Sequence, residues 1–330
     1  MQETIPIMTN YFCTLFDSGY LIKGMTMMES LVQWCPDAHV FVLCMDEKTR
    51  EILTASKRPY ITCIALADLE TPELLEAKKA RGVAEYCWTL SPCLPSFVLE
   101  HHPEIDFITY LDSDLLFYSS IQPIFDEIGN NSIAIIEHRF APRLKDREVN
   151  GRFCVEWVSF RRDEEGMRCL NRWREQCIEW CYYRLEDGKM GDQKYLDEWP
   201  DLYPNCHIIE HPGAGIAPWN YEKLHFSQDA SGRIEVEGAP LIFYHFHQFQ
   251  LLTNGLFDRL SAFYTAVCEE PAAVYKAYER ALMRALKGIR TISPGFSDGL
   301  RPFFMVMARR WVQRHVPLSL KRFLHHFIRY

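Results

Sequence analysis

Residues 9–66 decide the fold, because three apolar runs alternate there with two helical patterns. The apolar runs are TNYFCTLF (9–16), HVFVLCM (39–45) and PYITCIAL (59–66), and the helical patterns are LIKGMTMMESLVQW (21–34) and EKTREILTAS (47–56). Short apolar runs bounded by helices predict strands that are buried on both faces. Strands and helices in alternation predict right-handed crossovers and a parallel sheet covered by helices. The sequence therefore predicts an α/β fold.

The same alternation continues and then becomes mixed. Strands are predicted in IDFITYL (105–111), SIAIIEH (132–138), RFCVEWVSF (152–160) and PLIFYHFHQF (240–249). Helices are predicted in TPELLEAKKA (71–80), in SPCLPSFVLEHH (91–102), after Asp163, in GDQKYLDEWP (191–200) and continuously over 257–289. Loops are expected at 140–151 and in the Gly/Pro-rich segment 211–220. We therefore expect a sheet with some antiparallel strands.

The composition is that of a folded globular chain and excludes several classes of protein. The 330 residues are 48% hydrophobic and 24% charged, with a net charge of -8. A negative net charge argues against nucleic acid as a partner. No apolar run approaches the length of a membrane span, and the N-terminus lacks the regions of a signal peptide. The scattered cysteines, without a CxxC pair, predict reduced thiols in a cytoplasmic protein rather than disulfides or a zinc site.

Basic charge is concentrated at the C-terminal end. Residues 296–330 carry seven Lys or Arg side chains against one acidic side chain, interleaved with aromatic residues. Pro317 divides this tail into two short predicted helices, each too short to span a bilayer. The tail predicts peripheral contact with an anionic membrane surface, and packing on the acidic body is the alternative. We expect a catalytic domain at 1–255 and a helical extension with this tail at 256–330.

Two carboxylates follow the predicted strand 105–111 directly. Asp112 and Asp114 flank Ser113 on the turn that leaves this strand. Ligands of open α/β sheets bind at the carboxyl ends of the strands, and two carboxylates on one turn suit a hard divalent cation. The alternative is a turn that only caps the next element.

Two later motifs supply further candidates. His245 ends the late strand, with His247 on the same face, and an imidazole suits Mn²⁺ better than Mg²⁺. Either histidine taken alone is equally typical of a packed core. Asp192 and Gln193 offer the oxygen and amide groups that bind sugar hydroxyls. Asp192 also has the position of a helix N-cap, which would explain it without any ligand.

Taken in order, these motifs resemble glycosyltransferase family 8. The matching motifs are Asp-x-Gly-Tyr at 17–20, Tyr-Leu-Asp-Ser-Asp at 110–114, Gly-Asp-Gln at 191–193 and His-Phe at 245–246. The resemblance covers residues 9–250 and extends to related bacterial nucleotide-diphospho-sugar transferases. It implies the A-type glycosyltransferase fold, which is a Rossmann-like mixed sheet, here with a helical C-terminal extension.

The resemblance also implies a reaction and a role for each matching residue. The reaction would move a hexose from a UDP-sugar to a hydroxyl of a glycan or glycolipid, with retention, at the inner face of the membrane. Mn²⁺, or Mg²⁺, would be held by Asp112, Asp114 and His245. The nucleotide would contact Asp17, Gly19, Tyr20, Asp112 and Ser113. Asp192 would hold sugar hydroxyls, and Gln193 would lie under the anomeric carbon.

Two departures from the family pattern concern the donor site. The family has Phe/Tyr-Asn-x-Gly in the strand after the metal turn, where this chain has Cys154 and Glu156. The loop 211–220 reads Gly-Ala-Gly-Ile in place of Gly-Ala-Asn-Leu. Loss of an amide leaves the donor sugar open. We expect Glu156 either to change which acceptor hydroxyl is used or to reduce activity.

Two other functions remain open at this point. A metal-dependent sugar nucleotidyltransferase usually has a Gly-rich basic phosphate loop after the first strand, whereas only Lys23 is basic there. A catalytically silent sugar-nucleotide or glycan-binding protein would explain Cys154 and Glu156. Further candidate donor or acceptor contacts, for which solvated loop residues are the simpler interpretation, are Arg81, Glu85, Thr89 and 139–152.

Overall fold

The predicted alternation is present at the start of the structure, a computed structural model that describes residues 9–259 and 269–315. Its first elements are β1 (Asn10–Phe16), α1 (Leu21–Trp34), β2 (Ala38–Cys44), α2 (Glu47–Ala55) and β3 (Ile61–Ala65). β2 pairs in parallel with β1 on one side and with β3 on the other. All residues of β1 from Phe12 onwards are buried, which is why this strand is an unbroken apolar run.

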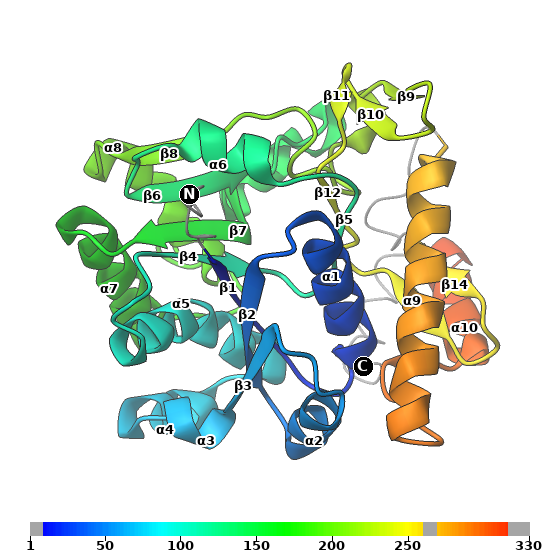
Figure 1. Ribbon diagram of the computed structural model, residues 1–330, viewed down its shortest axis with the longest axis horizontal. Coiled ribbons are helices and arrows are strands. Elements are labelled where there is room, and N and C mark those ends of the chain that lie inside the picture. Colours follow the sequence, from blue (N-terminus) through cyan, green and yellow to red (C-terminus); the bar gives the residue numbers. More distant parts are fainter. Residues whose placement is uncertain (1–8, 260–268, 316–330) are drawn as a thin grey trace, which may run out of the picture.

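A seven-stranded sheet forms the centre of the molecule, in the order β3-β2-β1-β4-β7-β6-β8 (Figure 1). Its second half consists of β4 (Phe107–Leu111), β6 (Ile133–Glu137), β7 (Phe153–Arg161) and β8 (Cys206–Ile209). β4 is parallel to β1 and β8 is parallel to β6, whereas β7 is antiparallel to both of its neighbours. The prediction of a mixed α/β sheet is therefore confirmed.

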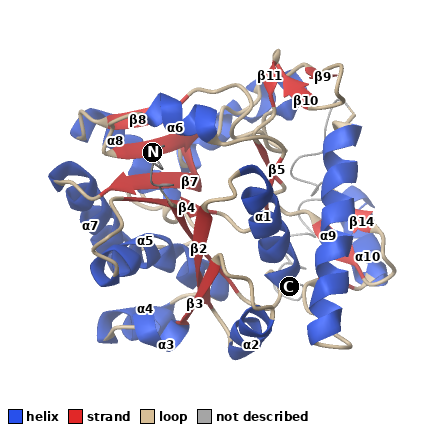
Figure 2. Cartoon of the chain, in the orientation of Figure 1, coloured by secondary structure: helices blue, strands red, loops and turns tan. Residues whose placement is uncertain are grey.

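Helices cover both faces of this sheet and bury two hydrophobic clusters (Figure 2). One face carries α3 (Leu66–Leu69), α4 (Pro72–Ala80), α5 (Val83–His101), α7 (Glu164–Glu179) and α8 (Trp199–Leu202). The other face carries α1, α6 (Gln122–Ile128) and α9 (Ala272–Ile292). The sheet is thus the middle layer of three.

α4 and α7 begin where the sequence predicts, whereas α5 begins earlier than predicted. The Thr71 hydroxyl caps α4 by accepting a hydrogen bond from the Leu74 backbone N–H, and Asp163 caps α7. α5 begins at Val83 rather than at Ser91, so the helix continues through two prolines. Its first turn is exposed and is capped by Glu85, which accepts a hydrogen bond from the Gly82 backbone N–H, and the helix becomes buried only from Tyr86 onwards.

A second, two-stranded sheet brings together two segments that are distant in the sequence. β5 (Leu115–Phe117) is antiparallel to β12 (Phe243–His245), and His245 lies opposite Leu115. β5 follows the Asp112–Ser113–Asp114 turn directly, so its pairing with β12 places His245 beside that turn. β12 is shorter than the strand predicted over 240–249: Pro240 belongs to β11, and residues 246–249 form a turn before β13.

The remaining small elements surround this two-stranded sheet. The short strands are β9 (Phe226–Gln228), β10 (Ile234–Val236), β11 (Ala239–Pro240), β13 (Gln250–Leu252), β14 (Phe257–Asp258) and β15 (Leu300–Arg301). The 3₁₀ helices are η1 (Pro142–Asn150), η2 (Gln193–Glu198) and η3 (Tyr221–Lys223). η1 occupies most of the segment expected to be a loop at 140–151.

The continuous helix expected over 257–289 is wrong at its start. Phe257 and Asp258 form β14, which pairs with β13 in a hairpin that turns at Gly255. α9 begins only at Ala272, and residues 260–268 lie outside the described part of the chain. The hydrogen bonds of the hairpin therefore override a helical pattern.

The described C-terminal residues pack onto the N-terminal part of the sheet. α9 packs against α1, and β15 pairs in parallel with β13. Between them, the strap (residues 293–299) buries Phe296 and reaches the loop at 17–20. α10 (Phe303–His315) follows, and the second predicted tail helix lies outside the described residues. In the described part of the chain, no helix has both the length and the apolar character needed to cross a bilayer.

Candidate active site

The Asp112–Ser113–Asp114 turn and His245 meet at the end of β4. The Nε2 atom of His245 lies 3.0 Å from Asp114 Oδ1 and 3.8 Å from Asp112 Oδ2. His245 and Asp114 are buried, whereas Asp112 is partly exposed. The pairing of β5 with β12 creates this cluster, which joins three of the residues predicted from the sequence.

The opposite nitrogen of His245 contacts a residue for which we expected another role. Nδ1 lies 2.6 Å from Glu156 Oε2, and the Glu156 side chain is completely buried. A buried carboxylate bonded to a core histidine does not face an acceptor. The structure therefore contradicts our expectation that Glu156 selects the acceptor hydroxyl.

The pKa values of this cluster are shifted in opposite directions. Burial raises the pKa of Asp112 to about 7, and the charges of Asp114 and Glu156 add to this effect. Burial also acts to raise the pKa of Asp114, but the charges of His245 and Lys23 outweigh it and lower the pKa well below its usual range. Burial alone would lower the pKa of His245, yet the Asp114 charge and its hydrogen bonds raise that pKa well above its usual value.

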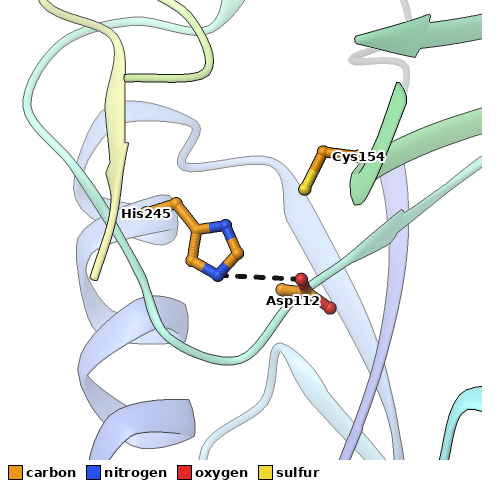
Figure 3. Close-up of side chains that lie close together, drawn as sticks. All are labelled: Asp112, Cys154 and His245. Atoms are coloured by element: carbon orange, nitrogen blue, oxygen red, sulfur yellow. Dashed lines mark ion pairs between the residues drawn. The ribbon is translucent and has the colours of Figure 1, made fainter. Parts of the chain in front are cut away.

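The donor atoms present fit a divalent cation. One oxygen of Asp112, the sulfur of Cys154 and a ring nitrogen of His245 all lie within 4.8 Å of one another (Figure 3). Carboxylate oxygens and one imidazole nitrogen are ligands that Mn²⁺ accepts, and a thiol suits softer ions such as Zn²⁺. Burial raises the pKa of the Cys154 thiol. The structure therefore brings together donor atoms of Asp112, Cys154 and His245, whereas Asp114, the third predicted ligand, pairs with His245 and Lys23.

The Gly/Pro-rich loop at 211–220 forms an aromatic wall beside His245. The Trp219 ring lies edge-on to His245, with ring centroids 5.1 Å apart, and also contacts His247. The Asn220 side chain holds this loop, since it donates to the backbone oxygen of Gly215 at 2.8 Å. Burial and the charge of His245 lower the pKa of His247 to about 3, so its ring is neutral. The sequence did not identify Trp219, because its role depends on contacts across the fold.

Asp192 faces the same region from η2, but it does not cap that helix. Its backbone is helical, and its side chain makes no capping hydrogen bond. The side chain is buried; this burial and the charge of Asp112 raise its pKa to about 7. Asp192 therefore stands at the predicted helix start, but its buried carboxylate makes no capping hydrogen bond and instead interacts with the charge of Asp112. Gln193 Nε2 donates to the backbone oxygen of Asn150 at 2.9 Å, and its side chain packs against Gly151.

The loop that follows β1 carries the predicted nucleotide contacts. Asp17 Oδ1 accepts a hydrogen bond from the Tyr20 backbone N–H at 3.2 Å, which closes the turn around Gly19. The Tyr20 ring is exposed and available for stacking, with the Lys23 ammonium 4.3 Å from its centroid. Lys23 also lies 3.6 Å from Asp114 Oδ2, so it links this loop to the carboxylate turn. This role of Lys23 could not be predicted, since the contact joins two elements that are separate in the sequence.

The other candidate contacts serve the framework of the fold. Arg81 donates to the backbone oxygens of Cys177 and Ile178 and so ties α5 to the end of α7. Thr89 Oγ1 accepts a hydrogen bond from Arg81 and donates to the Glu85 backbone oxygen. Glu85 accepts from the backbone N–H groups of Gly82 and Tyr183. In the segment 139–152, Arg139 bonds to the loop at 211–220 and Arg152 pairs with Glu137.

Solved structures similar to this chain are glycosyltransferases. An active-site mutant of LgtC matches 88% of this chain and 100% of its own, with a TM-score of 0.50 and 15% identity. The apo form of the glycosyltransferase GlyE of Streptococcus pneumoniae TIGR4 matches 86% of this chain and 64% of its own, also with a TM-score of 0.50 and 15% identity. The chain has the A-type glycosyltransferase fold, with a helical C-terminal region.

Comparison with known sequences gives a family without an assigned activity. No protein-family model matches the chain. The uncharacterized protein YfnF of Bacillus subtilis (strain 168) is 33% identical over 298 residues, which are 88% of this chain and 97% of YfnF. YfnD of the same organism, also uncharacterized, is 33% identical over 310 residues, which are 92% of this chain and 99% of YfnD. The chain therefore belongs to the family of YfnF and YfnD.

Proposed function

We propose that this protein is a metal-dependent glycosyltransferase that moves a hexose from a UDP-sugar to a hydroxyl of a glycan or glycolipid, with retention. The observation that carries the proposal is the meeting of the Asp112–Ser113–Asp114 turn with His245 at the carboxyl end of β4. Ligands of open α/β sheets bind at this edge. The fold shared with LgtC and GlyE supports the proposal, as do the motifs that resemble glycosyltransferase family 8.

In this proposal, three residues hold the cation and others bind the donor. Asp112, Asp114 and His245 would bind Mn²⁺, or Mg²⁺, which stabilises negative charge on a departing diphosphate. Tyr20, exposed beside Asp17, would stack on the base.

Two side chains of η2 would bind the donor sugar. The buried carboxylate of Asp192 would accept hydrogen bonds from sugar hydroxyls. The Gln193 amide, held by the Asn150 backbone, would lie under the anomeric carbon. Donor binding and cation binding would thus use neighbouring but separate groups of side chains.

Release of UDP from a panel of UDP-sugars, with and without Mn²⁺, tests this function. We expect slow, Mn²⁺-dependent release from one donor even without acceptor, and loss of that release in Asp114→Asn. Glu137→Gln is a suitable control, because Glu137 pairs with Arg152 and not with the candidate cation ligands. Consumption of UTP and a sugar phosphate would indicate a nucleotidyltransferase instead. Binding of UDP-sugars without release from any donor would indicate a silent binding protein.

We also propose that the basic tail holds the protein at an anionic membrane surface on the cytoplasmic side, near its glycan or glycolipid acceptor. On α10, the side chains of Phe304 and Trp311 are 80% and 60% exposed, as a membrane-facing helix requires. Because the strap buries Phe296 and contacts Gly19, a truncation that tests the tail should begin after Pro302 rather than after Ser293, so that the strap stays and α10 is removed with the rest of the tail. Sedimentation with anionic vesicles should fall in this variant. High salt should lower the sedimentation of the full-length chain in part, because it screens the charge of the tail. Equal sedimentation of the full and truncated chains would refute the proposal.

A further inference from the structure

Glu156 lies at an irregular point of the central sheet. Ile135 of β6 is opposite Val158 of β7, whereas Ile136 is opposite Cys154, so residues 155–157 form a bulge on β7. A bulge changes the direction in which side chains leave a strand and is common next to active sites. The bulge here turns a fully buried carboxylate toward His245.

The backbone and the side chain of Glu156 contact both halves of the candidate cation site. Its backbone oxygen accepts a hydrogen bond from the Asp112 backbone N–H at 3.2 Å. Its Oε2 atom lies 2.6 Å from Nδ1 of His245. A carboxylate can only accept, so the His245 ring donates through Nδ1 and leaves Nε2 to face Asp112 and Asp114. One residue thus connects the carboxylate turn to the histidine.

The second oxygen of Glu156 shows that hydrogen bonds alone do not explain its burial. Among the described residues, Oε1 has no hydrogen-bond partner. Arg139 supplies a positive charge near this oxygen. A Cβ atom built on Gly215 would lie 3.0 Å from Arg139 Nη2 and also 3.0 Å from Glu156 Oε1, so the distance between these two atoms is limited by the sum of the two. The two charged groups therefore lie within about 6 Å of each other, close enough to attract. A buried carboxylate that is costly and only partly bonded indicates a role beyond packing.

We infer that Glu156 is a positioning residue that fixes the tautomer and orientation of His245 and thereby raises the cation affinity of the site. Carboxylates that accept from the second nitrogen of a metal-binding histidine act in this way in many metal sites. Because Glu156 acts through the cation site, its role rests on the proposed function. It also gives the departure from the family pattern at this position a physical meaning, since neither Gly nor Asn could supply this charge.

Three variants distinguish this role from a structural ion pair. Glu156→Ala removes the acceptor, Glu156→Gln keeps an acceptor oxygen without the charge, and Glu137→Gln removes a carboxylate that pairs with Arg152. The first readout is the ¹⁵N NMR signal of the His245 ring in metal-free protein, recorded at a pH above the raised pKa of His245 so that the ring is neutral, and assigned with His245→Gln. The second is Mn²⁺ affinity, measured from the electron paramagnetic resonance of free Mn²⁺. Urea denaturation records the stability of each variant.

We expect a protonated Nδ1 in the wild type and loss of this preference in Glu156→Ala. Mn²⁺ affinity should fall about tenfold or more in Glu156→Ala, less in Glu156→Gln, and by less than about twofold in Glu137→Gln. An unchanged tautomer would overturn the inference, and so would equal losses of affinity in Glu156→Gln and Glu137→Gln. If Glu156→Ala does not fold, Glu156→Gln decides. If the wild type releases no UDP from any donor, the proposed function fails. The ¹⁵N signal of the His245 ring in the wild type and in Glu156→Ala still decides whether Glu156 sets the tautomer.

Discussion

Replacing Gly299 by alanine tests how the strap holds the candidate nucleotide loop. A Cβ atom on Gly299 would lie 2.2 Å from the backbone oxygen of Gly19. This is far inside an ordinary van der Waals separation of about 3.5 Å, so one of the two backbone segments must move. Gly295 provides a matched control in the same strap. Its φ of +86° is close to the +77° of Gly299, but no atom lies within 4 Å of its added Cβ.

The expected loss of stability follows from these two environments. A left-handed backbone costs alanine about 1–2 kcal/mol, and lower entropy of the unfolded chain offsets about 0.4–1 kcal/mol of it. Gly295→Ala should therefore lower the free energy of unfolding by about 1 kcal/mol. Gly299→Ala adds overpacking, which costs about 1–3 kcal/mol. The two variants should differ by about 2 kcal/mol, which is a factor of about 30 in the unfolding equilibrium.

Urea denaturation followed by tryptophan fluorescence measures this difference, and UDP binding measures its effect on the loop. Because the clash pushes on Gly19, UDP affinity should fall in Gly299→Ala and stay unchanged in Gly295→Ala. Equal unfolding free energies in the two variants would refute the packing argument. A stability loss without any change in UDP affinity would show that the strap supports the fold and not the nucleotide loop.

The remaining predictions concern the candidate active site and the thiols of Cys63 and Cys35. Gln193→Ala should lower turnover and spare UDP affinity, as measured by steady-state kinetics and calorimetry; a parallel loss of both would make Gln193 structural. Mn²⁺ affinity should rise from pH 5 to pH 8, because Asp112, with a pKa of about 7, must lose its proton to bind the ion; a flat profile would contradict this. A hydrogen bond from the Cys44 thiol lowers the pKa of Cys63 to about 7, so alkylation of Cys63 by iodoacetamide should rise through pH 7 and then level off. Cys35 should react slowly throughout, since burial and Asp37 raise its pKa to about 12.

The N-terminal half of the fold could be predicted because its strands are buried on both faces. Such strands are unbroken apolar runs, and the polar segments between them mark the helices. Short elements could not be predicted in this way. β5 has only three residues, and nothing in them indicates that they pair with β12. α5 begins at Val83, eight residues before the predicted start at Ser91, and its exposed first turn carries no apolar periodicity that would mark it in the sequence.

In the candidate site, too, features marked by local sequence could be predicted, whereas features that depend on contacts between distant elements could not. Asp112, Asp114 and His245 could be selected as candidates because the two carboxylates follow β4, the histidine ends β12, and their residue types suit a cation; their role as ligands stays a prediction. The burial of Glu156 against His245 does not fit the acceptor-selecting alternative, and reduced activity stays a prediction; the direction of this side chain depends on a bulge where β6 pairs with β7. Asp192 stands at the predicted helix start, but local sequence cannot show that its side chain is buried and interacts with the charge of Asp112.

The negative charge of the candidate active site favours binding of a cation, and this argument does not depend on any sequence motif. Burial and the charge of Asp112 raise the pKa of Asp192 to about 7, which shows that these carboxylates already repel one another. Lys23 lies against Asp114, so its charge is largely neutralised there. A diphosphate would bring further negative charge into this buried, poorly solvated region and would be repelled at short range. In the proposed function, a divalent cation between the carboxylates and the diphosphate would reverse that balance, which is the electrostatic reason to expect that donor binding depends on the metal ion.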